Sequence, residues 1–234
     1  MRANRALKTQ RGFWYDPGTP ALTEIPAASL GTGETYRLMT DLVAPRPIAW
    51  VSSQDPRGRR NLAPFSYYQA VCSHPAMVAL SFASHPDGRP KDTLTNILAT
   101  RELCISHVSE PFAAAMNATS APVPPEVSEW DLAGVPAEPS AVVAPPRVAG
   151  ALAHFECRLT HAIPLGVSTP GRPSSTLVVA EVVHFAVAAE LVQRDPKGRL
   201  RPIDPAALAA VGRLGGIAYT RTTDRFELAR PEAK

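Results

Sequence analysis

Two short segments carry residue types that together could bind a phosphate group. Ser81 ends an apolar run, and Lys91, Asp92 and Thr93 stand where the pattern predicts the start of a helix. The amide groups at a helix N-terminus have no partner within the helix and carry partial positive charge, so they stabilise an anion. Lys91 adds a full charge and Thr93 a hydroxyl donor. The alternative is that Asp92 only caps the helix while Lys91 is solvated.

A further segment, Asn61-Leu-Ala-Pro-Phe-Ser66, combines strand-forming residues with a proline in their middle. Proline has no N–H to give to a sheet, so we expect the strand ladder to be interrupted at Pro64. Amides and carbonyls that the sheet leaves free could bind the edge of a flat polar heterocycle. The alternative is a bulge without a ligand.

The common catalytic motifs are missing from the sequence, which has no G-x-S-x-G, H-E-x-x-H, Walker loop or strand-linked G-x-G-x-x-G. His154 and Glu156 would share one face of a strand, but no third residue has metal-like spacing. Cys157 lacks an activating base and is expected to be a small buried side chain. The three cysteines have no C-x-x-C spacing, which is typical of a reducing cytoplasm. We therefore predict no metal site.

The composition indicates a folded cytoplasmic protein. Of 234 residues, 45% are hydrophobic and 19% charged, and 24 Lys and Arg against 21 Asp and Glu leave a net charge of +3. That weak balance does not predict nucleic-acid binding. No apolar run approaches the ~20 residues that span a bilayer, and no apolar segment follows the basic N-terminus as in a secretory signal. The 25 prolines disfavour long helices and favour short strands with many turns.

The expected elements are mostly strands. We predict strands at residues 47–53, 61–68, 76–82, 103–108, 151–160 and 176–187, and the third of them is apolar enough to be buried on both faces. Short helices are expected from residue 91 onward, with Asp92 or Thr93 as N-cap, and at 111–118, 126–130 and 205–211. Residues 1–35 are interpreted as a partly extended N-terminal arm, residues 36–231 as the folded domain, and residues 121–146 as a proline-rich excursion. This pattern predicts a mainly β barrel with a few short helices in the connections.

Several motifs occur in a shared order: Arg46-Pro-Ile-Ala-Trp-Val-Ser-Ser53, Asn61-Leu-Ala-Pro-Phe-Ser66, Lys91-Asp-Thr-Leu94, Glu156-Cys157 and Arg213-Leu-Gly-Gly216. Together they resemble the flavin reductase-like family of FMN-binding split barrels, relatives in fold of the pyridoxamine-phosphate oxidases. The resemblance runs from about residue 36 to residue 231. It implies a six-stranded Greek-key split barrel, a homodimer, and FMN held without a covalent bond near the dimer interface.

The resemblance also implies which residues bind FMN. Asn61, Leu62, Ala63, Pro64, Phe65 and Ser66 would contact the isoalloxazine edge, and Ser52 and Ser53 would lie along the ribityl–phosphate part. Ser81, Lys91, Asp92 and Thr93 would form the phosphate end, with Arg46 as a helper. The loop 213–216 and Tyr219 would approach the site, either within the same chain or from the partner subunit. The excursion 121–146, the loop 84–90 and the N-terminal arm depart from many relatives.

The resemblance implies a flavin oxidoreductase that takes a hydride from NADH or NADPH. Electrons would then pass to a free flavin, oxygen, a metal complex or a partner monooxygenase. A flavin performs the hydride chemistry itself, so no catalytic side chain is assigned. The alternatives are an FMN-binding electron carrier without NAD(P)H activity of its own, and a barrel that binds another ligand such as haem. Neither nucleic acid nor a membrane is expected as a partner.

Overall fold

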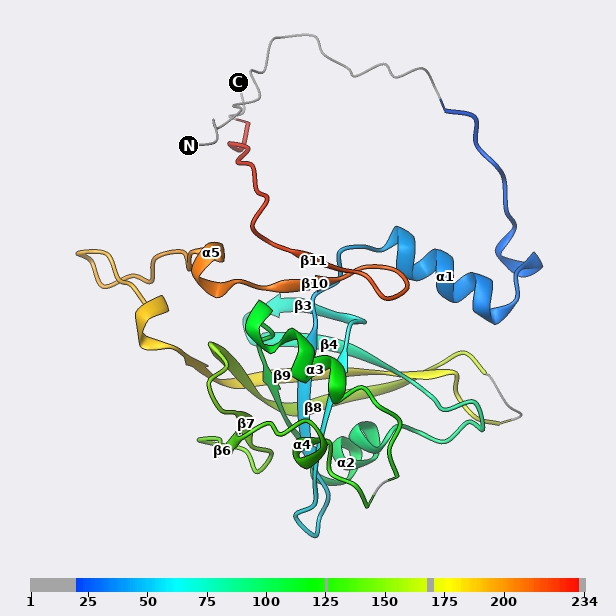
Figure 1. Cartoon of the computed structure of the whole chain (residues 1–234), viewed down its shortest axis with the longest axis horizontal. Helices are drawn as coiled ribbons and strands as arrows, with labels where there is room; N and C mark the ends of the chain where they lie inside the picture. The colour runs from blue at the N-terminus through cyan, green and yellow to red at the C-terminus, as the bar shows by residue number, and fades with distance from the viewer. Residues whose placement is uncertain (1–19, 125, 168–170, 232–234) are drawn as a thin grey trace.

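The computed structural model describes residues 20–124, 126–167 and 171–231 (Figure 1). Its centre is a seven-stranded antiparallel sheet in the order β2-β1-β5-β8-β9-β4-β3. The strands are β1 (Ala49–Gln54), β2 (Arg60–Phe65), β3 (Tyr68–Ser73), β4 (Ala76–Ala83), β5 (Glu102–Ser106), β8 (Ala153–Leu165) and β9 (Ser175–Val187). The prediction of a mainly β fold is confirmed, with seven strands in place of six because residues 68–73 form a strand of their own.

Within the described ranges, two small hairpins and five short α-helices accompany the sheet. The hairpins pair β6 (Ala137–Glu138) with β7 (Arg147–Val148), and β10 (Val211–Arg213) with β11 (Tyr219–Arg221). The helices are α1 (Thr32–Leu42), α2 (Asp92–Thr100), α3 (Ala113–Ala118), α4 (Glu129–Leu132) and α5 (Pro205–Leu208), with 3-10 turns at Ala27–Ser29, Glu110–Phe112 and Ala189–Leu191. No helix among the described residues is long and apolar enough to cross a membrane.

The sheet curls and encloses one core while it supports a second. Along β1, Ala49 and Val51 point into a cluster with β4, β5, β8, β9 and α2, and Trp50 points to the opposite face, into a cluster with Trp130 of α4. Each large side chain that is fully buried contributes about 1.5–3 kcal/mol. Phe65 of β2 meets Phe82 of β4 edge-on with ring centroids 4.5 Å apart, so the edge strand β2 contacts a strand near the opposite edge of the sheet.

Strand β2 is continuous, so the prediction that Pro64 interrupts its ladder is wrong. Ala63, Pro64 and Phe65 pair in register with Val51, Trp50 and Ala49. Strand β2 lies at the edge of the sheet, and Leu62 directs its N–H away from β1. Pro64, two residues later, has the same orientation, so its missing N–H removes no bond to β1.

Two further expectations differ from the structure. Strand β4 is buried on one face, at Val78, Leu80 and Phe82, and only half-buried on the other, because its outer face lies under a cleft. The N-cap of α2 is Lys91, with no side-chain cap, and neither Asp92 nor Thr93 caps the helix. The hydroxyl of Thr93 is instead turned to Asn61.

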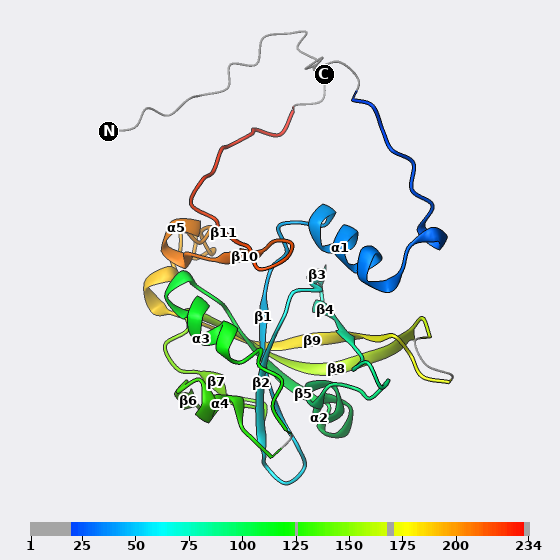
Figure 2. The ribbon, with the colours of Figure 1, turned by 45° about the vertical axis from the view of Figure 1, so that its right-hand side comes forward.

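Helix α1 was not expected from the sequence, and it spans the predicted boundary between arm and domain at residues 35 and 36. Glu34 accepts a hydrogen bond from the Gly31 amide at 3.1 Å and holds the first turn. Figures 1 and 2 show α1 and the hairpin β10–β11 on the same side of the sheet, beyond β3. The predicted arm therefore includes a helix from Thr32, and residues 1–19 lie outside the described part.

The proline-rich excursion 121–146 is attached to the sheet by two buried carboxylates. Glu156 of β8 accepts hydrogen bonds from the amides of Ala141 and Val142 at 2.8 and 2.6 Å and pairs with Arg147. Glu129, which belongs to the excursion itself, accepts hydrogen bonds from Asn61 and Leu62 of β2. The described residues of the excursion are thereby attached both to the central strand β8 and to the edge strand β2.

Candidate functional site

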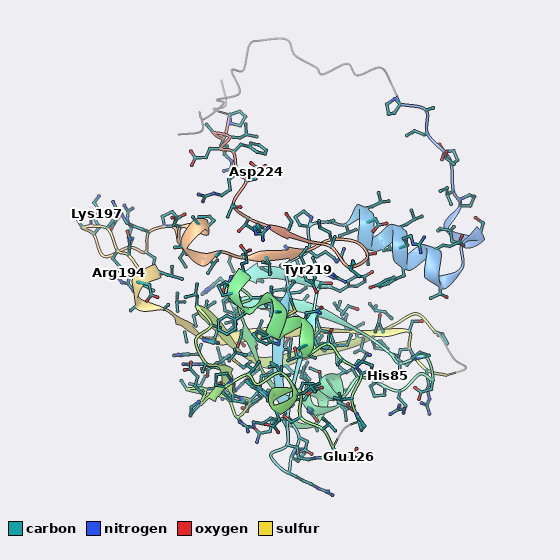
Figure 3. All side chains as sticks on the ribbon, viewed as in Figure 1. His85, Glu126, Arg194, Lys197, Tyr219 and Asp224 are labelled. Atoms are coloured by element: carbon teal, nitrogen blue, oxygen red, sulfur yellow. The ribbon has the colours of Figure 1, made fainter. Side chains whose placement is uncertain are left out.

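Two adjoining hollows meet at Pro64, Phe65 and Lys91 and form one cleft. Their volumes of about 610 and 380 Å³ are within the range of small-molecule sites. The larger hollow is bordered by α1, by β2 and β4 and by the end of the β8–β9 hairpin, through Thr32, Thr35, Tyr36, Met39, Ser66, Ser81, Ser174 and Ser175 among others. The smaller one is bordered by Asn61, Ala63, His85, Asp92, Thr93, Glu129 and residues 119–123 among others. His85 lies in the loop after β4 (Figure 3).

The start of α2 faces this cleft with features that favour an anion. Lys91 is half-buried, and within the ranges that the structure describes its ammonium group takes part in no hydrogen bond or ion pair. No side chain caps the first amides of the helix. Free amides, the helix dipole and an ammonium group act in the same direction on a negative charge. Asp92 lies in the same first turn, where its carboxylate is stabilised by the dipole.

Ser81 and Ser66 lie at the same cleft. Ser81 sits on the half-buried face of β4, and its amide donates to the carbonyl of Tyr67 at 2.8 Å. Ser66 follows β2 and accepts a hydrogen bond from Arg46 at 3.3 Å. The structure therefore brings eight of the residues singled out above to one cleft together with Asn61: Ala63, Pro64, Phe65, Ser66, Ser81, Lys91, Asp92 and Thr93.

Asn61 uses both polar atoms of its side chain in hydrogen bonds within the protein. Its Nδ2 donates to Glu129 Oε1 at 2.7 Å, and its Oδ1 accepts from Thr93 at 2.5 Å and from Ser53 at 3.3 Å. Asn96 of α2 completes the group with a 3.2 Å bond to Ser53 Oγ. Burial raises the pKa of Glu129, against the lowering effect of its amide donors. These residues form a polar network beneath the smaller hollow.

Leu62, Ser52 and Ser53 lie under the cleft and do not border it. Leu62 is fully buried in the second core. Ser52 and Ser53 are fully buried because β1 runs between β2 and β5. Ser52 Oγ is a buried polar atom without a partner among the residues described.

Arg46 is buried and directs its guanidinium to main-chain oxygens. It donates to the carbonyl of Thr40 in α1, to that of Val43 at 2.9 Å and to that of Leu214 at 3.0 Å. These bonds join α1 to the loop before β11, and among the described residues Arg46 reaches the cleft through its bond to Ser66. Its position is therefore at the far end of the site from α2.

Other residues that the sequence singled out have structural partners. Tyr219 stacks under the Arg213 guanidinium at 4.5 Å and donates to Asn117 of α3 at 3.1 Å, and it does not border the two hollows (Figure 3). His154 Nδ1 lies 3.0 Å from Ser106 Oγ. Within the described ranges no three His, Cys, Asp or Glu side chains are grouped as metal ligands would be.

Several residues of the cleft were missed by sequence reasoning. They are those of α1, the serines at the end of the β8–β9 hairpin, and Glu129. A capping glutamate at position 34 is a signal that could have located α1. Nothing in the local sequence marks Glu129, because its partners lie 67 and 68 residues away.

Comparison with known proteins decides the family. A model described as flavin reductase like domain matches residues 42–203, well over half of the chain. The chain belongs to the flavin reductase-like family. The family and the split-barrel fold expected from the sequence are thus confirmed.

Relatives of this family member align over most of its length. It is 38% identical to an uncharacterised protein of Halalkalibacterium halodurans over 203 residues, which make up 87% of this chain and 94% of that protein. Component B of nitrilotriacetate monooxygenase from Bacillus cereus has a TM-score of 0.83 at 34% identity, over 90% of this chain and 100% of that one. The 2-nitrobenzoate 2-nitroreductase of Pseudomonas fluorescens has a TM-score of 0.75 at 31% identity, over 89% and 96% of the two chains.

Proposed function

We propose that this protein binds FMN without a covalent bond in the cleft between α1, β2, β4 and α2, and that it is an NAD(P)H-dependent flavin oxidoreductase. The observation that carries the proposal is the ammonium group of Lys91, which has no partner among the residues that the structure describes. It lies beside the start of α2, which no side chain caps, at the junction of two hollows large enough for a cofactor. The ribityl chain of FMN ends in a phosphate monoester, which is the kind of group that such a site would bind. Family membership and the enzymes among the relatives support the same reading.

Each end of the cleft has its own task in this proposal. Lys91, the first amides of α2 and the Ser81 hydroxyl would hold the phosphate. The outward-facing main chain of β2 at Pro64, with Phe65 and Ser66, would orient the ring. Bound FMN would supply the hydride and electron chemistry. The chain itself binds, orients and shields, and no side chain is assigned a catalytic role.

The test is spectroscopic. The purified protein, titrated with FMN, should acquire the shifted visible absorption of a bound flavin. Anaerobic mixing with NADH and with NADPH should then bleach it rapidly. Bound FMN that neither nucleotide bleaches would favour the electron carrier, and a protein that takes up no FMN would refute the proposal.

The electron acceptor is proposed to be a separate molecule. One relative is component B of nitrilotriacetate monooxygenase, and another is named for the reduction of an aromatic nitro group. A partner monooxygenase that uses reduced flavin is therefore the first acceptor to test, with nitroaromatic compounds as the second. Oxidation of NADH or NADPH that is coupled to product formation by either would identify it.

We also propose that the protein is a homodimer. Helix α1 exposes Tyr36 and Met39 at the border of the larger hollow and Leu42 away from it, and β3 exposes Val71. Apolar side chains grouped on a helix and a sheet edge are typical of an interface. Light scattering should give twice the chain mass of 25.0 kDa at micromolar concentration. A mass of one chain would refute the dimer and leave FMN binding a separate question.

A further inference from the structure

Glu129 is a buried carboxylate that the excursion 121–146 delivers to the edge of the sheet. It is 8% exposed and opens the short helix α4. The next residue, Trp130, is 2% exposed and anchors α4 in the second core. The position of Glu129 is thus set by packing, independently of its polar contacts.

The two carboxylate oxygens of Glu129 determine the direction of a chain of hydrogen bonds. One oxygen accepts the main-chain N–H of Leu62 at 3.2 Å, and the other accepts Nδ2 of Asn61 at 2.7 Å. An ionised carboxylate only accepts, so the Asn61 amide must present Nδ2 to it. Asn61 Oδ1 then points the other way, where it accepts the hydroxyl of Thr93 at 2.5 Å.

This direction decides what Thr93 can do. A hydroxyl has a single proton, and that of Thr93 is donated to Asn61. Thr93 therefore cannot donate to a phosphate while the chain of bonds is intact. It ties the first turn of α2 to β2, and the phosphate is left to Lys91 and the helix amides.

We propose that Glu129 is a positioning residue for the phosphate end of the flavin site. It orients Asn61, and through the hydrogen bond between Asn61 and Thr93 it holds the first turn of α2 against β2. In that position Lys91 and the helix amides can bind a phosphate. This inference rests on the proposed FMN site. It assigns to the proline-rich excursion a function in binding, in addition to its wall of the smaller hollow.

The decisive variant is Glu129→Gln, which has nearly the same size. Its amide N–H₂ would face either the N–H of Leu62 or the N–H₂ of Asn61, so one pair of donors is opposed whichever way it turns. We expect FMN to bind about tenfold more weakly, while riboflavin, which has no phosphate, changes by less than about twofold. Glu126→Gln is the matched control, because Glu126 is exposed in the same excursion (Figure 3), and it should leave both affinities unchanged.

A double variant tests the network itself. In Asn61→Asp with Glu129→Gln, the new carboxylate at 61 can accept from Thr93, Ser53 and the new amide at 129, whose oxygen still accepts from Leu62. We expect it to recover part of the preference for FMN over riboflavin. If the single variant does not fold, the double variant decides alone: FMN affinity within about threefold of wild type supports the proposal, and a larger loss contradicts it.

Three results would overturn the proposal: unchanged FMN affinity in Glu129→Gln, equal losses for FMN and riboflavin, or a double variant without any recovery. A wild-type protein that binds neither flavin would instead refute the proposed function. The melting temperature of each variant distinguishes a general loss of stability from a selective loss of phosphate binding.

Discussion

Lys91→Ala removes an ammonium group that lies half-buried at the start of α2, where no protein carboxylate among the described residues neutralises it. The structure therefore provides a charge that is available to a ligand. If the FMN phosphate lies there, loss of the Lys91 ammonium group should weaken the binding of FMN. The binding of riboflavin should be unaffected, because riboflavin ends in a hydroxyl group.

The magnitude follows from the surroundings of Lys91. A hydrogen bond to a charged group contributes about 1.5–3 kcal/mol, which corresponds to roughly ten- to a hundredfold in affinity. The amides of α2 remain in the variant, so the site keeps part of its attraction for an anion. Lys91 borders an open cleft, so solvent screens its charge, and the effect should shrink as salt shortens the screening length from about 8 Å at physiological ionic strength.

The assay is titration of each variant with FMN and with riboflavin at low and high salt, followed by flavin fluorescence. Lys197→Ala is the matched control, since Lys197 is exposed in a loop far from His85 and the cleft (Figure 3). Equal losses for both flavins would mean that the variant disturbs the fold. No loss for either would refute the phosphate site at α2 and move the search to Arg46.

Three other predictions concern stability and thiol chemistry. Arg147→Ala leaves Glu156 buried without its cation and should cost about 3–5 kcal/mol of unfolding free energy, measured by urea denaturation; a cost under about 1 kcal/mol would contradict the ion pair. Burial disfavours the ionised Glu156, but amide donors and Arg147 outweigh it and hold the pKa of Glu156 below its usual 4.5. Its stabilisation is therefore present above that pH and lost as the pH falls through the lowered pKa, so acid should destabilise wild type more than Glu156→Gln. Burial raises the pKa of Cys104 to about 12 and that of Cys157 well above normal, so a thiol reagent should modify only exposed Cys72 in the folded protein without loss of FMN binding; a second fast thiol would contradict the burial.

The sequence was sufficient for the fold class because the signals involved are local. Alternating apolar residues, turn residues and prolines predicted the strands now seen as β1, β4, β5, β8 and β9, and the resemblance identified the family. Local signals failed where tertiary position overrides them. Pro64 reads as a break in a strand, yet an edge strand accommodates a proline whose missing N–H would face outward.

For the cleft, too, the local sequence predicts some features and tertiary contacts determine the others. The local sequence alone placed Lys91 and Thr93 at a helix start, because the apolar period of the helix and the turn before it both lie within a few residues of them. Whether a side chain at the site is free or engaged depends on partners that the fold brings from elsewhere in the chain. Asn61 meets Glu129 from 68 residues away and Thr93 from 32, so its oxygen and its amide are both used within the protein. The sequence determined which residues could bind a phosphate, and the tertiary contacts decided that Lys91 and the helix amides remain available while the hydroxyl of Thr93 does not.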